Sequence, residues 1–129
     1  MNLTSRLVKI FAVTLGLTGL GLLFVPGLLT VTPQPETGGS LLLVQLLGAA
    51  FLGLASANWT ARESILGGIY GRAVVGGNQT FTFIGTLVVI SSFPENPSPV
   101  FLWVFAVLLF GMVLFSILQF RPSWLDKKK

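Results

Sequence analysis

Four long apolar runs alternate with short polar segments along the chain. They extend over residues 10–31, 41–59, 74–93 and 100–120. At a rise of 1.5 Å per residue, a helix of about twenty apolar residues crosses a hydrocarbon core about 30 Å thick. The pattern therefore predicts an all-α integral membrane four-helix bundle that forms one domain.

The segments between the runs are typical of helix ends and loops. Residues 32–40 and 94–99 collect Pro, Gly, Ser and Thr, which interrupt helices. Ser98, followed by a proline, predicts an N-cap and a favoured first-turn proline for the last helix. Residues 60–73 predict a longer, glycine-rich loop between the second and third helices, and residues 121–129 predict a polar tail.

A signal peptide and a soluble bundle fit the apolar runs less well. The basic residues Arg6 and Lys9 precede the first run, as in a signal peptide, but this run is longer than a typical signal-peptide core and lacks an Ala-x-Ala-like site. A soluble four-helix bundle would need a polar outer stripe on each helix, whereas only 9% of the residues are charged. We therefore expect the first run to be retained as a membrane span.

The positions of the basic residues predict the orientation. The segments 32–40 and 94–99 contain no lysine or arginine and carry only Glu36 and Glu95. Short loops rich in cations stay in the cytoplasm. We therefore expect a multi-pass protein of the cell inner membrane with both ends inside, and we expect no nucleic-acid partner because the cations are scattered. The cations are Arg6, Lys9, Arg62, Arg72, Arg121, Lys127, Lys128 and Lys129.

The best candidate for a binding site is the 60–73 loop with the adjoining helix ends. Two arginines beside a glycine-rich backbone and a helix N-terminus could hold an anion such as a lipid phosphate. A plainer interpretation is favoured: positive-inside topology, a tight glycine turn and an ion pair between an arginine and Glu63. The candidate residues are Asn58, Trp59, Arg62, Glu63, Tyr70, Arg72, Asn78 and Gln79.

Few residues in the sequence suit catalysis or metal binding. Cysteine and histidine are both absent, and none of the four apolar runs contains an ionisable residue. Ionisable groups inside a span usually mark proton or ion routes, so their absence argues against a proton-coupled carrier. We predict no catalytic residue, no metal site and no cofactor.

Small residues form a ladder on the second predicted helix at Ala49, Gly53 and Ala57, and Gly48 with Ser56 widens this surface. Such a small-xxx-small pattern favours close contact between helices. We expect it to pack within the four-helix unit. Pairing between subunits, and hence a homo-oligomer, stays open as the alternative.

Four short segments lie at characteristic places in the layout of the chain: residues 6–8, 24–26, 46–48 and 61–62. In these segments and in its layout the chain resembles the DoxX-like group of small bacterial four-helix membrane proteins. This resemblance implies a four-helix inner-membrane protein, in some relatives associated with quinone-linked oxidation, although no residue here can be matched to that activity. A second likeness, of residues 76–83 to small fluoride channels, lacks their glycine and arginine signature on the first helix.

These observations favour a non-enzymatic role. The leading hypothesis is an accessory or scaffold protein that binds an anionic lipid or a membrane protein partner through the loop between the second and third helices. The alternatives are a small-anion channel or transporter, or a quinone-linked protein of the DoxX-like kind.

Overall fold

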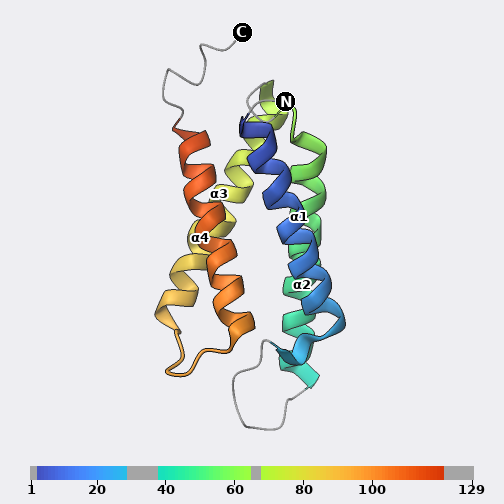
Figure 1. The fold of residues 1–129 in the computed structure, drawn as a ribbon, viewed down its shortest axis with the longest axis vertical. Coiled ribbons are helices and arrows are strands. Elements are labelled where there is room, and N and C mark those ends of the chain that lie inside the picture. Colours follow the sequence, from blue (N-terminus) through green and yellow to red (C-terminus); the bar gives the residue numbers. More distant parts are fainter. Residues whose placement is uncertain (1–2, 29–37, 65–67, 121–129) are drawn as a thin grey trace.

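The computed structural model describes residues 3–28, 38–64 and 68–120. These residues form four α-helices and one short 3-10 helix, and each α-helix is long and apolar enough to cross a membrane (Figure 1). The described chain is therefore an all-α four-helix bundle and a multi-pass membrane protein. The elements are α1 (Leu3–Phe24), η1 (Pro26–Leu28), α2 (Gly38–Ala61), α3 (Gly68–Ser91) and α4 (Pro99–Gln119).

The helices run alternately up and down as two pairs. Helix α1 packs extensively on α2, and α3 on α4, whereas the contacts between the two pairs are fewer (Figure 1). The start of α1, the end of α2 and the start of α3 lie together. We call this the basic end of the bundle, because it carries Arg6, Lys9, Arg62 and Arg72.

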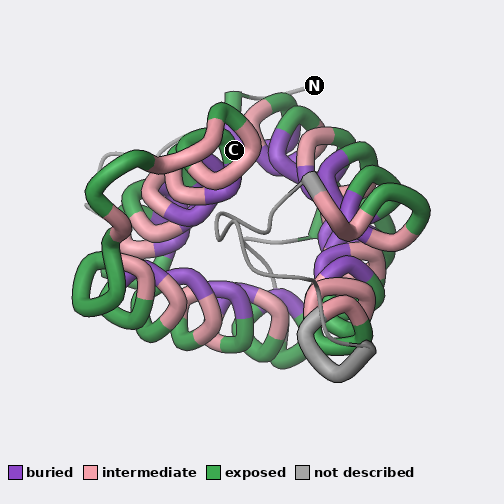
Figure 2. Tube along the Cα trace, turned by 90° about the horizontal axis from the view of Figure 1, so that it is seen from below, coloured by how far each residue is buried: buried purple, intermediate pink, exposed green. Residues whose placement is uncertain are grey.

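Buried residues face the inside of the bundle, and exposed residues face outward (Figure 2). Phe11, Phe51 and Phe115 are completely buried. The Phe11 and Phe115 ring centroids lie 5.3 Å apart in an edge-to-face arrangement that joins α1 to α4. Large aliphatic side chains such as Leu17 and Leu43 are about two-thirds exposed, as expected where lipid rather than water surrounds the helices.

The helices extend further toward the basic end than the sequence predicted. Helix α1 begins at Leu3 rather than at Ile10, so that Arg6 and Lys9 belong to the helix. Helix α3 begins at Gly68 rather than at Val74, which makes much of the predicted 60–73 loop helical. Packing outweighs the low helix propensity of glycine here, since Gly71 and Val75 are both buried.

At the opposite end of the bundle, the observed helix limits agree only in part with those predicted from the sequence. Ser98 caps α4 as predicted: its hydroxyl accepts a hydrogen bond from the backbone N–H of Phe101 at 3.1 Å, and Pro99 occupies the first turn. Helix α1 ends at Phe24, before Pro26, although the first run was predicted to continue to residue 31. The predicted tail 121–129 and most of the predicted first loop lie outside the described residues.

Helices α1 and α2 approach each other closely at a pair of glycines. A Cβ atom built on Gly48 would lie 2.8 Å from the carbonyl oxygen of Gly19, and one built on Gly19 would lie 2.7 Å from that of Gly48. Both contacts are shorter than real Cβ contacts, so the two backbones meet here because neither residue has a side chain.

The predicted small-residue ladder does not make this contact. Ala49 and Gly53 are exposed, Ala57 is half-buried, and a Cβ built on Gly53 would have no described atom within 4 Å apart from its chain neighbours and the backbone of α2 itself. The structure thus places Ala49 and Gly53 on the outer surface of the four-helix unit. Helix α2 is rotated about its axis so that the neighbouring Gly48 faces α1, while Ala49 and Gly53 face outward.

Candidate functional site

The structure separates the predicted site residues into groups with different surroundings. Asn58 and Asn78 lie inside the bundle, where they are 0% and 1% exposed. Trp59 and Arg62 lie at the basic end, while Glu63 is exposed beside them. The predicted residues therefore do not form one common site.

Asn58 of α2 and Asn78 of α3 form a reciprocal pair. The Nδ2 group of Asn58 donates to Oδ1 of Asn78 at 2.8 Å, and the Nδ2 group of Asn78 donates to Oδ1 of Asn58 at 3.0 Å. Each Nδ2 group also donates to the carbonyl oxygen four residues earlier on its own helix, at Leu54 and Val74. Both amide hydrogens of each side chain are thus used within the protein, which indicates a structural role.

A row of buried polar residues continues from this pair along α3. Thr82 donates to the carbonyl oxygen of Asn78 at 2.8 Å, and Thr86 donates to that of Thr82 at 2.6 Å. Each hydroxyl group thus donates its hydrogen bond to a carbonyl oxygen of its own helix, as threonines commonly do in membrane helices. The polar face of α3 thus packs inside the bundle with its donors already engaged.

Gln79 faces a different neighbour from Asn78. Its Nε2 group donates to the Ser116 hydroxyl at 2.9 Å, and its Oε1 atom is within 3.2 Å of the same hydroxyl, which can donate to it. This contact joins α3 to α4. Gln79 is therefore a packing residue of the α3–α4 pair.

Three residues form what we call the basic-end cluster: Lys9, Trp59 and Arg62. The Nζ atom of Lys9 lies 5.4 Å from the centroid of the Trp59 ring, and the Cζ atom of Arg62 lies 4.5 Å from it. Arg62 also donates through Nη1 to the backbone carbonyl of Trp59, near the C-terminal end of α2. One cation from α1 and one from the turn that follows α2 thus converge on one indole ring.

The basic-end cluster leaves part of its polar surface available. Trp59 is 41% exposed, and Lys9 and Arg62 are half-buried. Among the described residues, no carboxylate pairs with either cation, and the predicted ion pair with Glu63 is not formed. Since an arginine has five N–H donors, the hydrogen bond to Trp59 leaves most of the guanidinium free to bind an anion.

The remaining predicted residues lie outside this cluster. Tyr70 is 87% exposed and Arg72 is exposed as well, both in the first turns of α3. Lys9 was absent from the predicted site, because the first apolar run placed it in front of a helix rather than within one. The spacing of Arg6 and Lys9, one helical turn apart, was the available signal.

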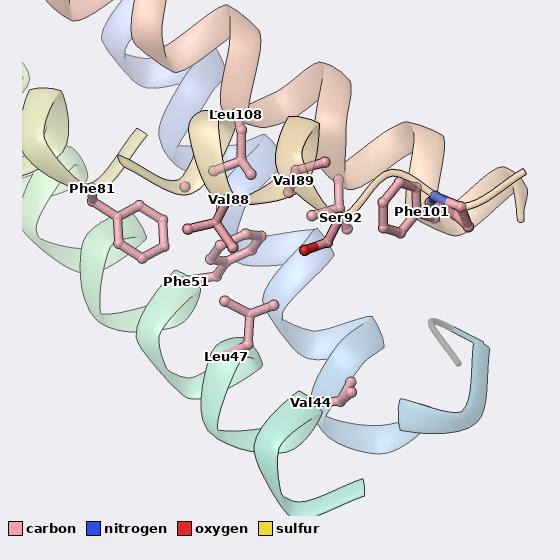
Figure 3. Close-up of a pocket in the computed structure, with 12 residues that line it drawn as sticks. Val44, Leu47, Phe51, Phe81, Val88, Val89, Ser92, Phe101 and Leu108 are labelled. Carbon is pink, nitrogen blue, oxygen red and sulfur yellow. The ribbon is translucent and has the colours of Figure 1, made fainter. Parts of the chain in front are cut away.

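An apolar groove with a volume of about 540 Å³ lies between α2, α3 and α4 (Figure 3). It occupies the half of the bundle away from the basic end. Ser92 is the single described lining residue with a polar side chain. The lining residues are Val44, Leu47, Phe51, Phe81, Gly85, Val88, Val89, Ser92, Pro94, Phe101, Val104 and Leu108.

Metal-binding side chains are not grouped in the described part of the chain. No set of three or more acidic side chains lies close enough there to hold a metal ion, and the sequence contains neither histidine nor cysteine. The chemistry available at the described sites is therefore hydrogen bonding, charge and apolar contact.

Comparison with known proteins adds no relative: no protein-family model matches the chain, and no curated protein or solved structure matches it. The resemblance to the DoxX-like group thus stays a prediction. The fold and the contacts described above define the class of protein, a multi-pass membrane four-helix bundle.

Proposed function

We propose that this protein is a non-enzymatic accessory or scaffold protein of the cell inner membrane that binds the head group of an anionic lipid at the basic-end cluster. The observation that carries the proposal is the convergence of Lys9 and Arg62 on the Trp59 ring, at 5.4 Å and 4.5 Å from its centroid. By the positive-inside rule this end of the bundle faces the cytoplasm.

The composition of the cluster suits a phosphate at a membrane surface. Tryptophan prefers the boundary between hydrocarbon and water, which places its neighbours at the depth of the lipid head groups. A lysine or arginine near an anionic membrane surface contributes about 1 kcal/mol to binding. Two cations held at one indole ring, with no described carboxylate to neutralise them, therefore favour an anionic head group over a zwitterionic one.

The proposal revises the site expected from the sequence. Asn58, Asn78 and Gln79 are engaged in contacts within the bundle and would not touch the lipid. Arg72, one of the two expected anion ligands, makes no cation–π contact in the described part of the chain. In the proposed site Lys9, rather than Arg72, is the second cation beside Arg62.

Native mass spectrometry can test the proposal by counting phosphatidylglycerol and phosphatidylcholine molecules retained by the detergent-purified protein. The test variant is Lys9→Gln combined with Arg62→Gln, and the matched control is Arg6→Gln combined with Arg72→Gln. Both remove two positive charges from the same end, but Arg6 and Arg72 are exposed and lie outside the cluster.

The test variant should bind phosphatidylglycerol at least about tenfold more weakly than wild type, since it loses direct hydrogen bonds to a charged phosphate, each worth about 1.5–3 kcal/mol. The control should keep a clear preference for phosphatidylglycerol. Equal losses in both double variants would show that only general surface charge attracts the lipid, and would refute a specific site. Retention of a protein in place of a lipid would also refute the lipid proposal, in favour of a protein partner.

A further inference from the structure

The side chains that line the apolar groove between α2, α3 and α4 differ between its two ends. At its deep end, Phe51 and Phe81 meet edge to face with ring centroids 5.7 Å apart. At its other end lie Ser92 and Pro94, where α3 stops and the connection to α4 begins. Hydrocarbon side chains line the space between these ends, as Figure 3 shows.

The groove has the length of one membrane leaflet. From Phe81 to Ser92, the residue after the end of α3, the chain rises about 17 Å at 1.5 Å per residue. Half of a hydrocarbon core is about 15 Å thick. The aromatic pair therefore lies near the middle of the membrane, and Ser92 lies near the head groups of the leaflet opposite the basic end.

The width of the groove selects among apolar occupants. A volume of about 540 Å³ open to the centres of water-sized molecules, spread over about 17 Å, corresponds to a width of about 6 Å for those centres. Adding one radius of about 1.4 Å on each side gives a groove about 9 Å wide between the lining side chains. A helix with its side chains is about 10–12 Å across and cannot enter such a groove. A single hydrocarbon chain can, because carbon atoms pack at about 3.5–4.0 Å from their neighbours.

The groove is also accessible from the side. Val88, which lines it, is 57% exposed on the outer surface of the bundle, and α2 and α3 make few contacts with each other. An apolar chain can thus enter from the surrounding leaflet between α2 and α3. No polar side chain of the described lining would have to lose water except that of Ser92.

We infer that this groove binds one hydrocarbon chain of a lipid from the leaflet opposite the basic end, with the head group at the level of Ser92 and the chain end at Phe51 and Phe81. The inference goes beyond the proposed head-group site, which lies in the other leaflet. It requires apolar contact and not charge.

Photolabelling in phosphatidylcholine vesicles tests the depth and the place of binding. One probe phosphatidylcholine carries a diazirine at the methyl end of an acyl chain, and a second carries it beside the ester. The methyl-end probe should label peptides containing Phe51, Phe81 or Leu108. The ester-side probe should label peptides containing Ser92 or Phe101.

Two substitutions on α3 provide a matched comparison. Val88→Trp puts a large side chain at the mouth of the groove, whereas Ile90→Trp puts the same side chain on a residue that does not line it; Val88 is 57% exposed and Ile90 55%. Labelling of the groove residues should fall several-fold in Val88→Trp and stay unchanged in Ile90→Trp. Circular dichroism and size-exclusion profiles check that both variants are folded.

Three results would overturn the inference. One is equal labelling of the groove in both variants. Another is labelling spread evenly over outward residues such as Leu43 and Val113, as for lipids that merely surround the protein. The third is a dimer in native mass spectrometry that Val88→Trp abolishes, which would show that a second copy covers the groove. Because the probes are zwitterionic, none of these results depends on the basic-end cluster.

Discussion

Asn58 and Asn78 hold each other through two hydrogen bonds of 2.8 and 3.0 Å, although twenty residues separate them and they belong to different helix pairs. They lie where α2 and α3 otherwise make few contacts. A side-chain amide pair accepts only a narrow range of positions, unlike apolar contacts, which tolerate sliding. The pair therefore fixes the height of the α3–α4 pair relative to the α1–α2 pair.

Replacing Asn58 or Asn78 alone should lower the free energy of unfolding by more than half of the loss caused by replacing both. Asn58→Leu leaves the Asn78 amide buried without its partner, at a cost of about 1–2 kcal/mol, and Asn78→Leu should behave in the same way. The free energy of unfolding should fall less in the double variant than the sum of its decreases in the two single variants. Unfolding by sodium dodecyl sulfate in mixed micelles, followed by tryptophan fluorescence, measures these free energies.

A suitable control for the amide pair is Asn96→Leu, because Asn96 is exposed between α3 and α4. This variant should change the free energy of unfolding by less than about 0.5 kcal/mol, as is usual for surface substitutions. Strictly additive losses at Asn58 and Asn78 would contradict the coupling of the two side chains.

Two glycines on α2 should respond oppositely to alanine. Gly48→Ala would place a Cβ atom 2.8 Å from the Gly19 carbonyl oxygen, and backbone atoms cannot yield without separating the helices. We expect a loss of about 1–3 kcal/mol in the same unfolding assay. Gly53→Ala meets no described atom within 4 Å apart from its chain neighbours and the backbone of α2, and should be neutral or stabilise by up to about 1 kcal/mol through its higher helix propensity. Similar effects at both positions would rule out the described rotation of α2.

The orientation can be read from single cysteines, since the sequence contains none. Ser64→Cys lies after α2 at the basic end, and Asn96→Cys lies at the opposite end; both positions are exposed. In intact spheroplasts a membrane-impermeant maleimide should modify Asn96→Cys and should reach Ser64→Cys only after permeabilisation. The reverse pattern would overturn the expected orientation.

The four helices and the Ser98 cap could be predicted from the sequence because they depend on local composition. Long apolar runs and a Ser-Pro step need no knowledge of neighbours. The helix starts were less predictable. Charged residues mark the limit of the first apolar run, but Arg6 and Lys9 continue the helix beyond it, which brings Lys9 to Trp59.

The faces of the helices could not be predicted, for a reason particular to membrane proteins. In lipid, both the buried and the exposed sides of a helix are apolar, so that periodicity does not reveal the core. Gly48 and Gly53 were equally good candidates for close packing, and only Gly48 is used. Asn58 and Asn78 were singled out as ligand-binding residues, although two amides near adjoining helix ends are equally consistent with the mutual contact that they make.

The unequal contacts among the helices have a consequence for biogenesis. The extensive contacts join helices that follow one another in the chain, so each hairpin can assemble soon after it leaves the ribosome. The Asn58–Asn78 contact can form only after both hairpins are in the bilayer, and until then each amide lacks its partner in the other helix. A hairpin without its counterpart therefore exposes a polar group within the membrane, a feature by which quality-control proteases can distinguish an unassembled chain from a finished one.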